Sequence, residues 1–255
     1  VHISPTYSIV TNIDREHMDY YKSMKDLKNH FVKFIKKVPS FGKSFICNDD
    51  KINRDLIKII KNKNYYTYGQ KENSNFTIKN IKQSKSFSKF DLKINLPNKN
   101  ILYIKNFKIP LFGIHNIRNA VGAIGVALTV GIPVSKIKLG LINFKGVQRR
   151  FNKIFTWNDI DFFDDYAHHP TEIKTVLDGV NKVYKGFEKV CIFQPHRISR
   201  LKDLRKEFSF AFKDADIVVL CPIYSAGEKI KLGFNYNKFA KEIIQNSKVK
   251  LFLVN

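Results

Sequence analysis

The chain has 255 residues, which is enough for two domains of ordinary size, and 44% of them are hydrophobic, which is enough to fill a core in each. Its 45 Lys and Arg outnumber its 22 Asp and Glu, leaving a net charge of +23. The lysines are spread through nearly every segment, so a compositional bias explains the charge better than a nucleic-acid surface does. The apolar runs are far shorter than the roughly 20 residues that cross a bilayer, which excludes a membrane protein.

The three cysteines lie far apart in the sequence, at positions 47, 191 and 221. Without a paired motif they exclude a zinc ribbon or a disulfide framework, and they favour the reducing cytoplasm. The first residue is Val1 rather than Met, so we expect the chain to be part of a longer gene product.

Residues 1–148 are expected to form one α/β domain. Alternating β-branched residues predict a strand at residues 7–13. Ser23 is the expected N-cap of a helix whose apolar residues keep helical spacing until Pro39. The elements predicted next are strands 44–47 and 65–68, helix 50–60, short strands 76–81, 87–94 and 101–107, and helices 115–130 and 135–143. Small residues along the helix at 115–130 predict that it packs closely against neighbouring backbone. The first part of this order favours a parallel sheet, and the short strands favour an antiparallel appendage.

Residues 149–255 are expected to form a second α/β domain. Strands alternate with helices here, as in doubly wound, Rossmann-like domains. The predicted strands are 160–163, 190–193, 217–220 and 249–254, and the predicted helices are 171–183, 203–212 and 236–245. The chain stops on a strand, so this domain is expected to be truncated.

Residues 164–172 carry the densest chemistry in the sequence. The polar side chains at the start of this run are those of Asp164, Asp165, Tyr166, His168 and His169. They follow an apolar strand, at the end where ligands bind in open α/β sheets, and Pro170 suits the first turn of the helix behind them. We predict a functional site here. The alternative is a structural cluster at a helix N-terminus.

Residues 194–200 follow the next predicted strand and should reach the same edge of the sheet. Arg197 and Arg200 are suited to clamp a carboxylate or a phosphate in bidentate fashion. The alternative for two isolated arginines is a solvated surface.

Two polar segments in the first domain are further candidates. His17 stands among three acids, Asp14, Glu16 and Asp19, where a divalent metal beside a phosphate is one reading and an ordinary polar loop is the other. Asn116 and Asn119 are three residues apart and share one face of a helix's first turn, where their amides suit a base or a ribose. Helix capping by Asn116 is the alternative.

One apparent phosphate loop is excluded by its spacing. Gly42, Lys43 and Ser44 match the end of that motif, but Lys37 occupies the position of its first glycine. The triplet also enters a predicted strand rather than a helix.

Six motifs in order resemble the Mur ligase superfamily, most closely its branch that adds L-alanine to UDP-N-acetylmuramate. They lie at residues 9–19, 113–120, 146–151, 164–173, 193–200 and 223–228. The resemblance implies a partial central ATPase domain followed by a Rossmann-like C-terminal domain. It also implies a reaction with ATP and magnesium, in which an acyl phosphate of UDP-N-acetylmuramate is attacked by the amine of L-alanine.

The resemblance also implies a role for each matching residue. His17 corresponds to a ligand of the second magnesium ion. The residues matched to the nucleotide site are Asn116, Asn119, Arg150, Asp165 and Tyr166. The residues matched to the amino acid and the transferring phosphoryl group are His168, Arg197 and Arg200. The family's UDP-binding domain, phosphate loop and magnesium-binding Glu have no counterpart in these 255 residues.

Departures from the family pattern leave alternatives open. Arg15 and Glu16 replace a small residue and Asp, Ile198 and Ser199 replace Tyr and Thr, and Ala167 replaces a common Gly. Ala167 is shared with a murein-tripeptide ligase of the same superfamily, and folylpolyglutamate ligases are more distant candidates. Outside the family, a basic α/β module that binds nucleic acid is the rival function.

Overall fold

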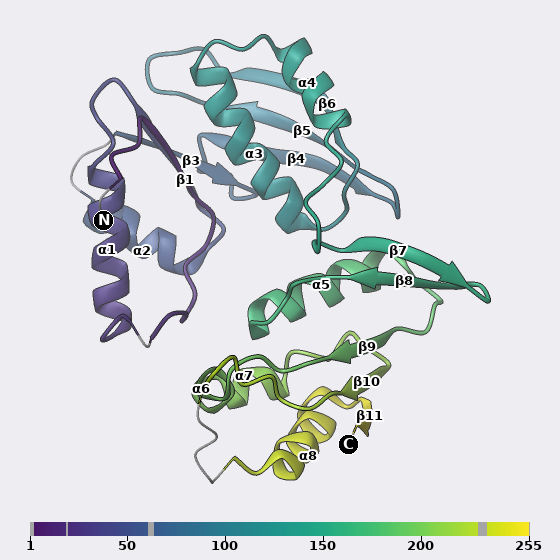
Figure 1. Ribbon diagram of the computed structural model, residues 1–255. Coiled ribbons are helices and arrows are strands. Elements are labelled where there is room, and N and C mark those ends of the chain that lie inside the picture. The colour runs from purple at the N-terminus through teal and green to yellow at the C-terminus, as the bar shows by residue number, and fades with distance from the viewer. Residues whose placement is uncertain (1–2, 19, 61–63, 229–233, 255) are drawn as a thin grey trace. The chain divides into compact units, whose positions relative to one another are not determined.

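The computed structural model describes residues 3–18, 20–60, 64–228 and 234–254 (Figure 1). The chain divides into two compact units, Val1–Lys145 and Gly146–Asn255. The mixed α/β class that the sequence predicts is confirmed in both units. No helix in the described ranges is long and apolar enough to cross a membrane.

The first unit is built on a six-stranded sheet in which the strands follow one another in chain order. Its strands are β1 (Tyr7–Val10), β2 (Lys43–Cys47), β3 (Tyr65–Gly69), β4 (Phe76–Gln83), β5 (Ser88–Ile94) and β6 (Leu102–Ile109). The pairs from β1 to β4 are parallel, and β4, β5 and β6 pair antiparallel. The predicted antiparallel appendage is therefore confirmed, and it continues the parallel sheet.

Helices cover both faces of this sheet (Figure 1). They are α1 (Met24–Lys36), α2 (Lys51–Ile59), α3 (Ile114–Thr129) and α4 (Val134–Ile142). Side chains alternate between the faces of a strand, so on β2 Phe45 joins the core under α3 and α4, and Ile46 joins the core under α1 and α2. Ser23 caps α1 as predicted, because its hydroxyl accepts from the N–H of Asp26 at 3.1 Å.

Small residues let α3 lie close to the sheet. A methyl group added at Gly125 would stand 2.6 Å from the ring of Phe45, and one at Gly122 would stand 2.9 Å from Ile9. The prediction of close packing by this helix is confirmed, and its nearest neighbours are side chains rather than backbone. The packing sets the position of the first turn of α3, which carries Asn116 and Asn119.

The second unit contains a parallel three-stranded sheet and a separate hairpin. The sheet has the order β11 (Lys250–Leu253), β10 (Ile217–Leu220), β9 (Val190–Phe193), and the hairpin consists of β7 (Asn152–Trp157) and β8 (Ile160–Asp164). The helices are α5 (Pro170–Val183), α6 (Ile198–Asp203), α7 (Arg205–Ser209) and α8 (Tyr236–Ser247). Phe193, Phe208, Phe212 and Phe239 are central to the core between them.

Two sequence predictions in this unit are wrong. The strand at 160–163 was expected beside the strand at 190–193, but β8 pairs antiparallel with β7, a strand that the sequence did not predict. Asn158 and Asp159 both adopt positive φ, 44° and 61°, which are the dihedrals of a two-residue hairpin turn. The helix expected at 203–212 begins at Ile198 and is interrupted at Leu204, so Arg200 lies on a helix and not in a loop.

Candidate active site

Asp165 ties together the two ends of the hairpin. Its Oδ2 accepts from the N–H of Phe151 at 2.9 Å, and its Oδ1 accepts from the N–H of Ala167 at 2.7 Å. Burial raises the pKa of this carboxyl group, although both hydrogen bonds act in the opposite direction. The carboxylate therefore links the backbone just before β7 to the backbone just after Tyr166.

Tyr166 carries the exposed aromatic ring of the site. The residue is 46% exposed, and the guanidinium of Arg149 lies 4.8 Å from the ring centroid. Nε of Arg149 lies 3.3 Å from the carboxylate of Asp164, and the N–H of Tyr166 donates to the carbonyl oxygen of Arg149 at 2.8 Å. Arg149, just before the hairpin, therefore contacts both the ring and the backbone of Tyr166. Arg149 was not among the predicted site residues.

Glu172 connects the start of α5 to the arginine at position 150. Its Oε2 accepts from the N–H groups of His168 at 3.0 Å and His169 at 3.2 Å. Its Oε1 lies 3.8 Å from Nη1 of Arg150, a long ion pair between partly exposed groups. The sequence signal for this role was present, because a Glu three residues after an N-cap residue completes a capping box.

The two adjacent histidines have different roles. His169 is the N-cap of α5, accepts from the N–H of Thr171 at 3.3 Å, and is buried, so the structural alternative holds for it. Nδ1 of His168 lies 2.9 Å from the carbonyl oxygen of Tyr166 and donates to it. In the neutral ring of His168, Nε2 is then left as an acceptor. His168 remains a candidate for chemistry.

The segment after β9 meets this cluster through His196. The rings of His168 and His196 are 6.1 Å apart, and Nη1 of Arg200 donates to the carbonyl oxygen of His196 at 3.1 Å and approaches its Nδ1 at 3.4 Å. Burial lowers the pKa of His196, and the charges of Arg200 and His168 lower it further. His196 therefore favours its neutral form beside the arginine.

These contacts join the polar residues of the second unit into one cluster. It runs from Arg150 through Glu172, His168 and His196 to Arg200. The two motifs meet as predicted, but the predicted reason is wrong, because β8 and β9 belong to different sheets.

Asn116 and Asn119 lie in the first unit, on the first turn of α3. The helix starts after Gly113, which has no capping side chain, so Asn116 does not cap it. The amide of Asn116 instead donates to the carbonyl oxygen of Phe112 at 2.7 Å. Asn119 is exposed at the helix surface. An exposed amide of this kind has the hydrogen-bonding groups that a nucleoside requires.

His17 lies on the loop after β1 and is exposed. Its backbone has a φ of 56°, and its carbonyl oxygen accepts from the N–H groups of Tyr20 and Tyr21 at 2.9 Å. Asp19, which was part of the predicted metal loop, lies outside the described residues. Within the part of the chain that the structure describes, no group of three His, Cys, Asp or Glu side chains is arranged to hold a metal ion. These residues therefore do not complete a magnesium site.

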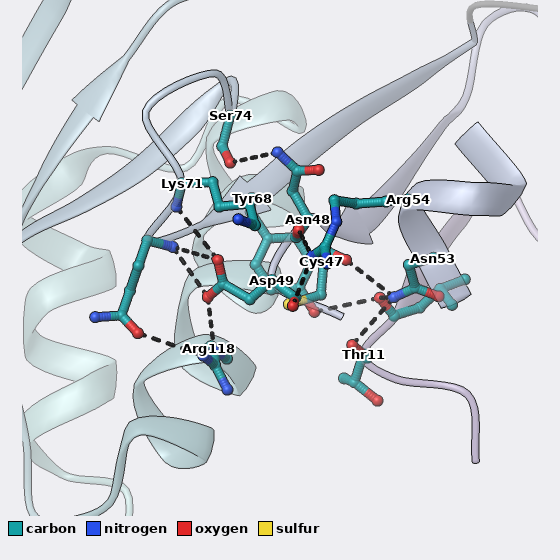
Figure 2. Close-up of polar contacts among 12 residues, drawn as sticks. Thr11, Cys47, Asn48, Asp49, Asn53, Arg54, Tyr68, Lys71, Ser74 and Arg118 are labelled. Carbon is teal, nitrogen blue, oxygen red and sulfur yellow. Dashed lines mark hydrogen bonds and ion pairs between the residues drawn. The ribbon is translucent and has the colours of Figure 1, made fainter. Parts of the chain in front are cut away.

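The sequence analysis missed the polar cluster around Asp49 (Figure 2). The carboxylate of Asp49 accepts from the backbone N–H groups of Gln70 at 2.9 Å and Lys71 at 3.2 Å, and from Nε of Arg118 at 2.7 Å. Nη1 of Arg54 donates to the carbonyl oxygen of Asp49 at 2.8 Å. The cluster joins the loops after β2 and β3 to α3, and no local sequence pattern indicates it.

Comparison with protein families assigns both units. The Mur ligase middle domain matches residues 1–127, and the family described as Mur ligase, glutamate ligase domain matches residues 149–252. The chain belongs to the Mur ligase family. Its two units therefore correspond to the middle and C-terminal domains of a Mur ligase, as the resemblance implied.

Individual Mur ligases match all or most of the chain. The UDP-N-acetylmuramate–L-alanine ligase of Pelagibacter ubique is 68% identical over 254 residues, which are 100% of this chain and 55% of that protein. The ligase of the same name from Brachyspira hyodysenteriae is 42% identical over 89% of this chain and 48% of its own. The chain thus spans about half the length of these relatives.

Solved structures agree with this assignment. The UDP-N-acetylmuramate-alanine ligase of Thermotoga maritima superposes with a TM-score of 0.72 at 25% identity, over 98% of this chain and 51% of that structure. A murein peptide ligase from Psychrobacter arcticus has a TM-score of 0.62 at 22% identity, over 100% of this chain and 50% of its own, which shows the shared fold alone.

Proposed function

We propose that this chain supplies the middle and C-terminal domains of a cytoplasmic enzyme that joins L-alanine to UDP-N-acetylmuramate, with ATP, in the synthesis of peptidoglycan precursors. The 68% identity to the Pelagibacter ubique ligase of that name, along the whole chain, carries the proposal. The connected polar cluster of the second unit supports it, because it presents cationic and imidazole groups for an anionic substrate.

The proposed reaction has two steps. The lactyl carboxylate of UDP-N-acetylmuramate attacks the γ-phosphorus of ATP, which forms an acyl phosphate and releases ADP. The amine of L-alanine then attacks the acyl carbon, the C–O bond to phosphate breaks, and inorganic phosphate leaves. Such chemistry requires positioning and charge neutralisation rather than a protein nucleophile.

Five residues are proposed to take part in nucleotide binding. They are Asn116 and Asn119 in the first unit and Arg150, Asp165 and Tyr166 in the second. Their chemistry fits that ligand, because Asn119 presents an exposed amide, Tyr166 an exposed ring and Arg150 a guanidinium. Both oxygens of Asp165 already accept backbone hydrogen bonds, so we assign it the role of ordering the Tyr166 loop.

His168, Arg197 and Arg200 are proposed to hold the amino acid and the transferring phosphoryl group. Arg200 is oriented by the carbonyl oxygen of His196, and the ring of His168 is oriented by that of Tyr166. If the acceptor amine loses its proton near His168, the unprotonated Nε2 of that residue is the group suited to take it. The two guanidinium groups would neutralise the carboxylate and the phosphoryl oxygens.

Magnesium is the usual partner of ATP in such reactions, and His17 is proposed as one residue of its site. The described residues do not by themselves complete that site. No step above therefore depends on the metal.

The test is a chimera in which this chain replaces the matching 254-residue stretch of the Pelagibacter ubique relative. We expect phosphate release from ATP that requires both UDP-N-acetylmuramate and L-alanine, with the ligated product identified by mass spectrometry. Offering murein tripeptide to the same chimera tests the alternative in the family. Product with tripeptide and none with L-alanine would reject the proposal.

The 255-residue chain on its own is expected to be inactive. It contains no phosphate loop to bind the β- and γ-phosphates of ATP, because Lys37 stands where the motif before Lys43 requires glycine. In the same assay, the purified chain should release phosphate from ATP no faster than buffer without protein does. Release of phosphate that depends on L-alanine would contradict the prediction that the 255-residue chain is inactive by itself.

A further inference from the structure

Residues 224–228 form a loop that fixes the backbone before Arg197. The N–H of Arg197 donates to the carbonyl oxygen of Tyr224 at 2.9 Å, and the N–H of Tyr224 donates to that of Pro195 at 2.8 Å. The ring of His196 stacks on the ring of Tyr224, with centroids 5.4 Å apart and planes inclined by 17°. Three separate contacts therefore hold this stretch of chain against the loop.

Glu228, at the end of the same loop, fixes the backbone after Arg197. Its Oε2 accepts from the N–H of Ser199 at 3.0 Å, and its Oε1 accepts from the Ser199 hydroxyl at 2.5 Å. Ser199 lies in the first turn of α6, where N–H groups lack partners within the helix, and the N-cap residue Arg197 provides none. Glu228 supplies the missing acceptor from 29 residues away in the sequence, with a charge that suits a helix N-terminus.

Arg197 itself has a strained backbone. Its φ of 68° lies in the left-handed region that favours glycine, and such a conformation persists only where its surroundings enforce it. The contacts of Tyr224 before Arg197 and of Glu228 after it hold the backbone in this conformation. Arg200 follows three residues later, so the start of α6 orients both arginine side chains together.

We propose that Glu228 is a positioning residue that holds Arg197 and Arg200 in the geometry needed for the carboxylate of the amino-acid substrate. The inference rests on the proposed function of these two arginines. Glu228 contacts Ser199 and is assigned no contact with the substrate, so it acts through the backbone. Without it the strained conformation at Arg197 can relax, and the guanidinium is then misplaced for bidentate binding.

In the chimera, Glu228→Ala is expected to raise the KM for L-alanine by about tenfold and to change the KM for ATP by less than about twofold. Glu228→Gln keeps one acceptor oxygen for Ser199 and should restore most of the affinity. Ser199→Ala removes only the hydroxyl donor and should raise the same KM by about threefold.

The matched control is Glu242→Gln in the same unit. Oε2 of Glu242 lies 2.6 Å from Nε of Arg205, and this pair links α8 to α7, whereas Arg197 is the N-cap of α6. If Glu228 has only a structural role, Glu228→Ala should resemble this control. The amount of active enzyme would then fall, and the KM for L-alanine would not change. That result would overturn the proposal.

Two further measurements separate the inference from the function beneath it. In the 255-residue chain, hydrogen exchange at the Ser199 amide should be fastest in Glu228→Ala, intermediate in Glu228→Gln and slowest in the wild type. Equal rates in Glu228→Ala and the wild type would overturn the positioning role of Glu228. If Arg197→Lys raises the KM for L-alanine while both Glu228 variants leave it unchanged, the positioning role fails alone. If Arg197→Lys also has no effect, the proposed role of the arginines fails.

Discussion

Asp49 and Arg118, 69 residues apart in the sequence, form an ion pair in which Oδ2 and Nε are 2.7 Å apart and the aspartate side chain is only 8% exposed (Figure 2). Arg118 stands between Asn116 and Asn119 on α3. The pair therefore links the turn that carries both proposed nucleotide contacts to the ends of β2 and β3.

Asp49→Ala is expected to lower the free energy of unfolding of the first unit by about 3 kcal/mol, because it leaves Arg118 without its carboxylate partner and two backbone N–H groups without an acceptor. The rate of alkylation at Cys47 measures this. That thiol is 2% exposed and burial raises its pKa, so it reacts when the unit opens. The rate should rise about a hundredfold.

The control for this experiment is Glu72→Ala, which removes an ion pair with Lys79 from the surface of the same unit. The side chain of Glu72 is 71% exposed, so Cys47 should be alkylated at the wild-type rate in this variant. Equal acceleration of alkylation in the Asp49 and Glu72 variants would show that the Asp49–Arg118 pair contributes no more to stability than the exposed pair of Glu72 and Lys79.

Arg197→Lys in the chimera is expected to raise the KM for L-alanine roughly ten- to a hundredfold and the KM for ATP much less. The charge is kept, but the bidentate geometry is lost, which costs about 1.5–3 kcal/mol. Steady-state kinetics with each substrate varied in turn measures the difference. Lys202→Ala, an exposed residue of the same helix, is the control. Equal losses for both substrates would place Arg197 on the transferring phosphoryl group instead.

His17→Ala in the chimera is expected to raise the magnesium concentration needed for half-maximal rate by about tenfold, if one ligand of the metal is lost. His30→Ala is the control, because His30 also lies near a carboxylate, 3.4 Å from Asp26, but on helix α1. Binding of Mn²⁺, followed by its electron paramagnetic resonance signal, gives a readout that does not depend on turnover. An unchanged metal titration in His17→Ala would leave His17 as an ordinary loop residue.

The carboxyl group of Glu228 is expected to titrate below its ordinary pKa of 4.5. Burial acts to raise this pKa, but the hydrogen bonds from Ser199 and the charge of Arg197 outweigh it and lower the pKa. The fold thus favours the ionised form, so its contribution to stability is present above pH 4.5 and is lost as the pH falls through the folded pKa. Carboxyl ¹³C NMR should show this midpoint, and Ser199→Ala should move it upward. A midpoint at or above 4.5 in the wild type would contradict the contacts of Glu228 with Ser199.

The sequence alone determined the α/β class, most of the elements and the motif residues, because helical and strand periodicities and cap residues are local properties. Ser23 before α1 and the small residues of α3 were identified in this way. Even the hairpin turn at Asn158 and Asp159 had a local signal, two residues that tolerate positive φ, which the sequence analysis overlooked.

The tertiary structure alone decided which distant groups meet. The sheet to which β8 belongs depends on long-range pairing, so the reason for the meeting of His168 and His196 was mistaken although the meeting itself was predicted. The contacts of Asp49 with Arg118 and of Glu228 with Ser199 join segments 69 and 29 residues apart. Hydrogen bonds of this kind leave no periodic trace in a single sequence, because their partners are brought together only when the core closes.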